Sequence, residues 1–165
     1  METIAKATTS KQLERIAQLA KRIWEEHYAP IIGAAQVAYM LDKFQSVAAL
    51  RQQLGTGAEY YALMFEANAV GYFCIAKRGD SLFLGKLYVL HTHRGKGLAR
   101  KALDFIVERA LEWRCKRIQL TVNKNNTGSI HVYQKMGFKN SGPLVQDIGG
   151  GYIMDDFLLE RELFA

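Results

Sequence analysis

The segment LYVLHTHRGKGLA, residues 87–99, joins three local patterns that together decide the fold class. The apolar run LYVL predicts a buried strand, and the spacing of Leu98, Ala102 and Phe105 predicts a helix after it. A turn with two glycines and two cations separates them. The segment therefore predicts a strand, a basic glycine-rich turn and a helix, in that order.

The turn has the properties of an anion site. A helix that starts near Gly97 presents backbone N–H groups without intrahelical partners and the positive end of its dipole. Glycines let a phosphate approach such a backbone closely. The turn matches neither the Walker pattern nor a clean G-x-G-x-x-G, and alone it is equally compatible with a turn that binds nothing. Formal charge around it comes from Arg94, Lys96, Arg100 and Lys101.

A second pattern, N-x-x-S-x-x-x-Y-x-x-x-G-F, lies about thirty residues downstream and begins at Asn126. Asn126 and Tyr133 are seven residues apart, about two helical turns, so both side chains are expected on one helix face. Asn126 is a natural helix cap whose amide can also bind a ligand. Taken in isolation, Tyr133 is more typical of a core aromatic residue.

Outward from these motifs, the chain predicts a mixed α/β fold in one domain, residues 1–165. A short strand near residues 2–7 precedes a helix capped by Thr9 or Ser10, and residues 34–53 form one or two short helices. EYYALMF and AVGYFCIA form a hairpin, SLFLGKLYVL and RIQLTV are strands, and the tail forms two last strands around GGG. The regular alternation of a doubly wound dinucleotide fold is missing.

Charge is distributed unevenly in a chain whose formal net charge is +6. Residues 86–117 contain nine Lys or Arg and three acidic residues, whereas residues 147–165 contain five acidic residues and one Arg. The basic stretch is compatible with nucleic acid, with a small phosphate-rich ligand or with a solvated helix face. No apolar run reaches membrane-spanning length, and no signal-peptide core is present. Two distant cysteines, Cys74 and Cys115, favour reduced thiols and a cytoplasmic protein.

The two motifs together resemble the GNAT superfamily of N-acetyltransferases. R-x-x-G-x-[GA] stands at residues 94–99 after a strand ending in LYV, and the resemblance covers residues 58–138. The tail DIGGGYIMDDFLLERELF resembles a bacterial subgroup near the polyamine (PaiA-like) acetyltransferases. The implied fold is a central, mostly antiparallel sheet of about seven strands, splayed between strands 4 and 5 and flanked by about four helices.

The resemblance implies acetyl-CoA as acyl donor and no metal. The strand at residues 87–89 would pair with the pantetheine arm, and the backbone amides from Gly95 to Arg100 would hold the pyrophosphate. Asn126 and Ser129 would contact the donor from the opposite wall. The implied cofactor-binding residues are Leu87, Tyr88, Val89, Arg94, Gly95, Lys96, Gly97, Leu98, Ala99, Arg100, Asn126 and Ser129.

The resemblance also implies direct acetyl transfer to an amine, with Tyr133 as proton donor to the leaving CoA thiolate. A backbone N–H near Val89 would stabilise the oxyanion. Some relatives carry a glutamate base on the strand before the turn, where this chain has Gly85 and Lys86. The base is therefore left open among water and five side chains, Glu25, Glu26, His27, Asp155 and Asp156.

The expected acceptor is a small primary amine, with polyamines among the candidates. The substrate residues proposed from the sequence are Glu26, Tyr39, Asp155 and Asp156. His91 and His93 lack the further ligands that a metal site needs. Neither a nucleic-acid nor a membrane partner is expected, and a homodimer is left open.

Two alternatives remain at this point. The first keeps acetyl-CoA and changes the acceptor to a protein N-terminus or lysine, which needs an exposed peptide groove. The second is an acyl-CoA-sensing or nucleic-acid-binding regulator that uses residues 94–117. Acidic residues interleaved with the cations of this stretch argue against it.

Overall fold

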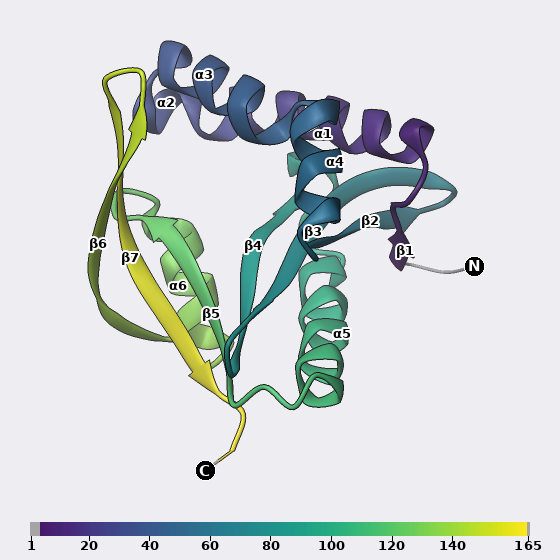
Figure 1. The fold of residues 1–165 in the computed structure, drawn as a ribbon, viewed down its shortest axis with the longest axis vertical. Helices are drawn as coiled ribbons and strands as arrows, with labels where there is room; N and C mark the ends of the chain where they lie inside the picture. The colour runs from purple at the N-terminus through teal and green to yellow at the C-terminus, as the bar shows by residue number, and fades with distance from the viewer. Residues whose placement is uncertain (1–3, 165) are drawn as a thin grey trace. The chain divides into compact units, whose positions relative to one another are not determined.

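The computed structural model describes residues 4–164. Hydrogen bonding orders seven strands as β1-β2-β3-β4-β5-β7-β6 (Figure 1). The strand bounds are β1 Ile4–Lys6, β2 Glu59–Phe65, β3 Asn68–Arg78, β4 Ser81–Val89, β5 Arg117–Asn123, β6 Lys139–Gly149 and β7 Tyr152–Glu162. β4 and β5 pair in parallel, while the β1–β2, β2–β3, β5–β7 and β6–β7 pairs are antiparallel. The predicted mixed α/β sheet is thus confirmed.

Residues 4–164 contain six α-helices and one 3-10 turn, more than the four helices expected. The extra helices arise before β2, where Pro30 lies in the first turn of one helix and Gly33 adopts φ 92°. Ser46 then starts the next helix, because its side chain accepts a hydrogen bond from the Ala49 amide at 3.2 Å. The bounds are α1 Ser10–His27, α2 Ala29–Ile32, α3 Ala34–Gln45, α4 Val47–Gly55, α5 Leu98–Glu112, α6 Thr127–Lys135 and the turn η1 His91–His93.

The chain forms two compact units. Unit 1 comprises Met1–Ala76 and Lys86–Ile106, and unit 2 comprises Lys77–Gly85 and Val107–Ala165. Three elements, β3, β4 and α5, begin in one unit and end in the other. The single domain remains a prediction. None of the helices among residues 4–164 combines the length and apolarity that a bilayer crossing demands.

In unit 1, α3 and α4 cover one face of β2 and β3 through a buried polar network. The Tyr72 hydroxyl donates to Gln45 Oε1 at 2.8 Å, and Gln45 Nε2 donates to the Tyr60 hydroxyl at 3.3 Å. The Tyr60 hydroxyl donates in turn to Gln53 Oε1 at 2.6 Å. Each buried hydroxyl therefore has a partner, which keeps the cost of burying it small.

The opposite face of β2 and β3 packs against α5. Tyr61 and Phe73 are register partners with ring centroids 4.9 Å apart, and the Phe105 ring meets Tyr61 at 4.9 Å. The strands of unit 1 consequently lie between two helical layers, which explains why β3 is apolar on both faces. This packing fixes the direction of α5 and hence the position of its first turn.

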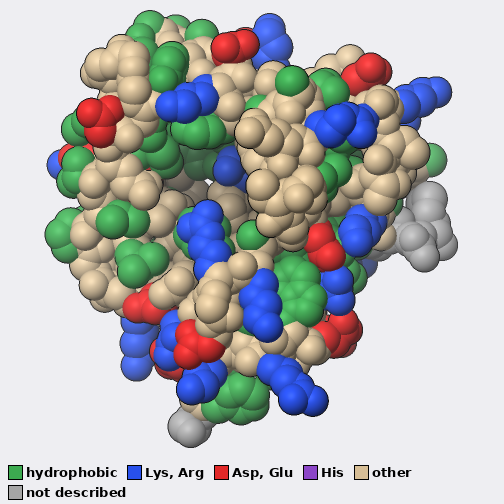
Figure 2. All heavy atoms as spheres, viewed as in Figure 1, with side chains coloured by type: hydrophobic (Ala, Val, Ile, Leu, Met, Phe, Trp, Pro, Cys, Tyr) green, Lys and Arg blue, Asp and Glu red, His purple; other side chains and the backbone are tan. Residues whose placement is uncertain are grey.

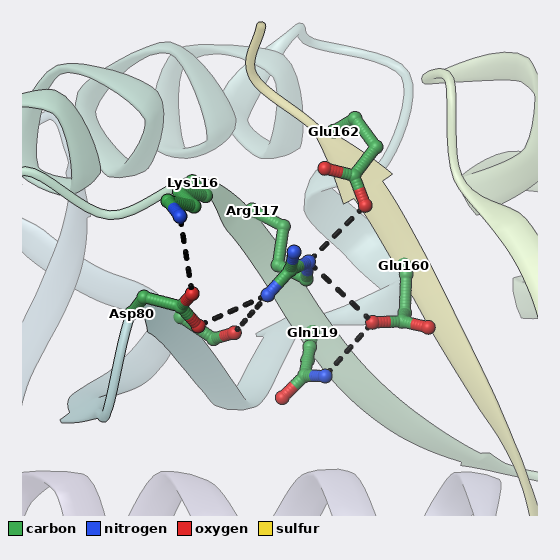
Figure 3. Close-up of polar contacts among 7 residues, drawn as sticks. Asp80, Lys116, Arg117, Gln119, Glu160 and Glu162 are labelled. Atoms are coloured by element: carbon green, nitrogen blue, oxygen red, sulfur yellow. Dashed lines mark hydrogen bonds and ion pairs between the residues drawn. The ribbon is translucent and has the colours of Figure 1, made fainter.

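In unit 2, ion pairs hold β4, β5 and β7 together where β4 and β5 begin (Figure 3). Arg117 Nη1 donates to Asp80 Oδ1 at 3.0 Å, and Arg117 Nε donates to Glu162 Oε1 at 3.1 Å. Lys116 also pairs with Asp80, at 3.8 Å. Gln119 Nε2 donates to Glu160 Oε2 at 2.8 Å. A hydrogen bond with Ser141, followed by this one from Gln119, lowers the pKa of the Glu160 carboxyl. At the opposite ends of β5 and β7, Asn123 is the register partner of Asp156.

Candidate functional site

The basic turn between β4 and α5 adopts the left-handed backbone that its glycines permit. Gly95 has φ 78° and Gly97 has φ 76°, a region that side chains with a Cβ rarely adopt. A Cβ built at either residue would meet no atom within 4 Å. Backbone conformation therefore requires these glycines, and the space in front of them is open to a ligand.

The first turn of α5 adds backbone donors to this open turn. The Lys101 amide donates to the Gly97 carbonyl at 3.1 Å, so the amides of Leu98, Ala99 and Arg100 precede the first intrahelical bond. Leu98 is buried and anchors the helix start in the core. Left-handed residues followed by a helix N-terminus form a concave set of N–H groups suited to an anion.

A neighbouring hairpin holds the turn in place. Glu66 and Ala67, the two residues between β2 and β3, both have positive φ, which brings Phe65 at the end of β2 to the turn. The Lys96 ammonium lies 5.1 Å from the Phe65 ring centroid, and the His93 ring lies 5.4 Å from the same centroid. Local sequence patterns do not point to Phe65, because only the fold brings this hairpin end to the basic turn.

The end of β4 directs one amide away from β3. The Leu90 amide donates to the Val70 carbonyl at 2.8 Å. Successive amides of an extended strand point to opposite edges, so the Val89 amide points away from β3. The parallel ladder with β5 pairs Ser81, Leu82 and Phe83, whereas β4 itself continues to Val89.

A cavity of about 260 Å³ lies in unit 1 beside this end of β4. Two of its lining residues, Val89 and Arg94, were predicted to bind the donor, and Glu26 was predicted to bind the acceptor. Ile23 had no predicted site role, and His91 was considered only for a metal site that lacked further ligands. The lining residues are Ile23, Glu26, His27, Val89, His91 and Arg94.

The Tyr88 side chain packs toward α1. The Tyr28 hydroxyl donates to the Tyr88 hydroxyl at 3.4 Å, and the Tyr88 ring centroid lies 5.9 Å from Trp24 and 5.5 Å from Tyr72. Only its backbone can therefore serve the role expected for this strand. Tyr39, a predicted acceptor residue, is half-buried on α3, where Lys43 Nζ donates to its hydroxyl at 3.3 Å, and it does not line the cavity.

In unit 2, α6 carries the second predicted motif. Asn126 occupies the N-cap position as expected and is 3% exposed, but its side chain makes no capping hydrogen bond. Ser129 and Tyr133 follow at helical spacing and are half-buried, so the three side chains share one helix face. The Tyr133 ring meets the Phe138 ring edge-on at 5.5 Å. Tyr133 is thus half-buried and is not a core aromatic residue.

The two adjacent aspartates of β7 have different environments. Asp155 forms an ion pair with Lys124, whereas Asp156 is 3% exposed. Burial, with a smaller contribution from the Asp155 charge, raises the pKa of the Asp156 carboxyl to about 6. Residues 4–164 contain no group of three or more His, Cys, Asp or Glu side chains placed to hold a metal ion.

Known proteins are similar to this chain in sequence and in fold. The chain is 29% identical over 101 residues to the spermine/spermidine N(1)-acetyltransferase of Bacillus subtilis (strain 168), covering 56% of this chain and 65% of that protein. It is 30% identical over 56 residues to N-alpha-acetyltransferase 30 of Saccharomyces cerevisiae, covering 34% of this chain and 32% of that protein.

The crystal structure of the PaiA N-acetyltransferase of Thermoplasma acidophilum, in complex with coenzyme A, superposes with a TM-score of 0.78. It covers 98% of this chain and 99% of that one at 19% identity, a likeness in fold. The model of the acetyltransferase (GNAT) family matches residues 13–138, most of the chain. The protein therefore belongs to the GNAT acetyltransferase family.

Proposed function

We propose that this protein is an acetyl-CoA-dependent N-acetyltransferase that transfers the acetyl group directly to a primary amine of a small molecule. One observation carries the proposal. The turn after β4 places two left-handed glycines, with open space in front of them, directly before the N-terminus of α5 in a chain of this family. That arrangement suits the pyrophosphate of coenzyme A.

The donor would be held through backbone groups and four side chains. The amides from Gly95 to Arg100 bind the pyrophosphate, and Arg94 and Lys96 add charge. The backbone of Leu87–Val89 pairs with the pantetheine arm, while Asn126 and Ser129 contact it from α6. The burial of Asn126 at the N-cap position of α6 supports this role.

The reaction would proceed without an acyl-enzyme. The neutral amine attacks the thioester carbonyl, so that a C–N bond forms and the oxygen becomes an oxyanion. The Val89 amide, which points away from β3, donates a hydrogen bond to that oxygen. The C–S bond then breaks, and the Tyr133 hydroxyl donates its proton to the CoA thiolate.

A polyamine is the first acceptor to test. Polyamines combine ammonium groups with methylene chains, and the cavity beside Val89 offers the Glu26 carboxylate and the Ile23 side chain. The Bacillus relative is named for spermine and spermidine, which supports the same acceptor class. The further acceptor residues proposed are Tyr39, Asp155 and Asp156.

A peptide acceptor is the second candidate. The similarity to a yeast N-alpha-acetyltransferase favours it, although that match spans 34% of this chain. Both acceptor classes leave the same thiol product. Spermine, spermidine, an aminoglycoside and an N-terminal peptide are therefore compared at equal concentration with acetyl-CoA by colorimetric release of CoA. A clear rate with one amine supports the proposal, whereas no release with any of them contradicts it.

The glycine turn gives a sharper test of donor binding. Replacing Gly97 with Glu should abolish acetyl-CoA binding in calorimetry, because a carboxylate would stand at the pyrophosphate position and repel it. Gly57→Glu is the matched control, since Gly57 also has positive φ, 104°, and equally open space but follows α4. Ordinary acetyl-CoA affinity in Gly97→Glu would place the pyrophosphate elsewhere.

A further inference from the structure

Asp156 is the one acidic residue among the buried polar residues that the structure describes. Four polar or charged residues among the described part of the chain are buried: Gln45, Ser81, Asn126 and Asp156. Gln45 is bonded to two tyrosines, and Ser81 accepts from Arg117 Nη1 at 3.3 Å. Asp156 is 3% exposed, and the neighbouring cation Lys124 pairs with Asp155 instead.

The strands around Asp156 supply no compensating charge. Its register partners are Asn123 on β5 and Leu144 on β6, which share its face of the sheet. The next residues on that face, Thr121, Leu158, Met154 and Gln146, carry no titratable group. Asp155, Lys124 and Asp147 are the nearest charged residues along the three strands, and the register places Asp155 and Asp147 on the opposite face.

A buried carboxylate without a counter-charge is unfavourable, because a charge out of water needs compensation. Burial accordingly raises the pKa of Asp156 to about 6, a value suited to a group that accepts and releases protons near neutrality. Asn123, opposite Asp156, is the last residue of β5, only four residues before α6. In open α/β sheets, ligands bind at this carboxyl end of parallel strands.

We propose that Asp156 is the group that receives the ammonium of the acceptor and takes its proton before acetyl transfer. This inference rests on the proposed acetyltransferase function. It assigns the base that the strand before the glycine turn, with Gly85 and Lys86, does not provide.

The proton balance is complete with groups already named. The acceptor arrives as R–NH₃⁺, and the Asp156 carboxylate takes one proton, leaving R–NH₂ and a neutral carboxylic acid. R–NH₂ forms the C–N bond, the nitrogen loses a second proton to solvent, and the C–S bond then breaks. Tyr133 protonates the thiolate and regains its proton from solvent. Asp156 finally releases its proton to water, so the net products are amide, CoA thiol and H⁺.

The decisive variant is Asp156→Asn, which keeps the shape of the side chain but cannot accept the proton. With an alkylamine acceptor, kcat should fall about 100-fold, and the fall in wild-type kcat below pH 6 should be absent in the variant. Acetyl-CoA affinity in calorimetry should stay unchanged. With a weakly basic amine, already neutral at the assay pH, the loss should shrink to a few-fold, because no proton must be removed first.

The control variant is Glu112→Gln, which neutralises an exposed carboxylate of α5 and should leave kcat unchanged. The inference is overturned if Asp156→Asn keeps wild-type kcat, keeps the acidic limb of its pH profile, or loses equal activity with both kinds of amine. In each of these cases the wild type is still an active acetyltransferase, so the result can be told apart from failure of the proposed function. A wild type that binds acetyl-CoA but acetylates no amine would overturn both.

Discussion

The hydroxyl of Tyr133 is the one group that a phenylalanine at this position would remove. Tyr133→Phe should lower kcat about 100-fold, because the thiolate would then leave without a positioned proton donor. The donor affinity should remain close to that of the wild type, since the ring contact with Phe138 is retained. Steady-state kinetics and calorimetry measure the two quantities. An unchanged kcat would contradict the assignment of Tyr133 as general acid.

Burial of Asp156 also has a consequence for stability that requires no substrate. Its folded-state pKa of about 6 exceeds the value near 3.9 of an unfolded chain, so the native state binds more protons between these values. Stability from this group is therefore present below pH 4 and lost as the pH rises through 6. At pH 8, Asp156→Asn should be more stable than the wild type by about 3 kcal/mol, and at pH 4 by almost nothing.

Urea unfolding at several pH values checks this difference. The Glu112→Gln control should follow the wild type at each pH, because Glu112 is an exposed carboxylate. A constant difference between Asp156→Asn and the wild type from pH 4 to pH 8 would mean that the carboxylate is not buried as a charge. The predicted stabilisation accords with a residue retained for function at the expense of stability.

The contact between β3 and β4 depends on a glycine. A Cβ added at Gly71 would overlap the Tyr88 carbonyl oxygen and approach the Leu63 side chain at 3.1 Å. Because a carbonyl in a strand cannot move aside cheaply, Gly71→Ala should destabilise the protein by about 1–3 kcal/mol. Gly128→Ala on α6 is the matched control, since nothing lies within 4 Å of that position. Equal stability of the two variants in chemical denaturation would refute this close approach.

Local patterns predicted most of these elements. The apolar spacing of α1 and the Thr9 cap are encoded within a few residues, and the capping box with Gln12 confirms the cap. Contacts between distant segments are not encoded locally. Three features depend on segments far apart in the chain: the burial of Asp156, the approach of Phe65 to the basic turn, and the cavity between α1 and Val89.

Charge over the molecule favours a small phosphate ligand over a nucleic acid. Several cations of the basic stretch are already paired, as Arg109 is with Glu112 at 2.8 Å and Arg117 is with Asp80 at 3.0 Å. On the face drawn in Figure 2, Lys and Arg side chains alternate with Asp and Glu side chains. A polynucleotide needs a continuous basic surface, whereas one pyrophosphate needs only the few cations at the glycine turn.

The path of the chain through its two units predicts a single unfolding transition. β3, β4 and α5 each continue from one unit into the other, so neither unit can unfold without breaking these elements. We therefore expect one calorimetric transition, with equal calorimetric and van't Hoff enthalpies. Acetyl-CoA at 100 times its Kd should add about 2.7 kcal/mol and shift the whole transition upward by roughly 5–10 °C. Two transitions, of which acetyl-CoA moves only one, would instead mean that the units fold as separate domains.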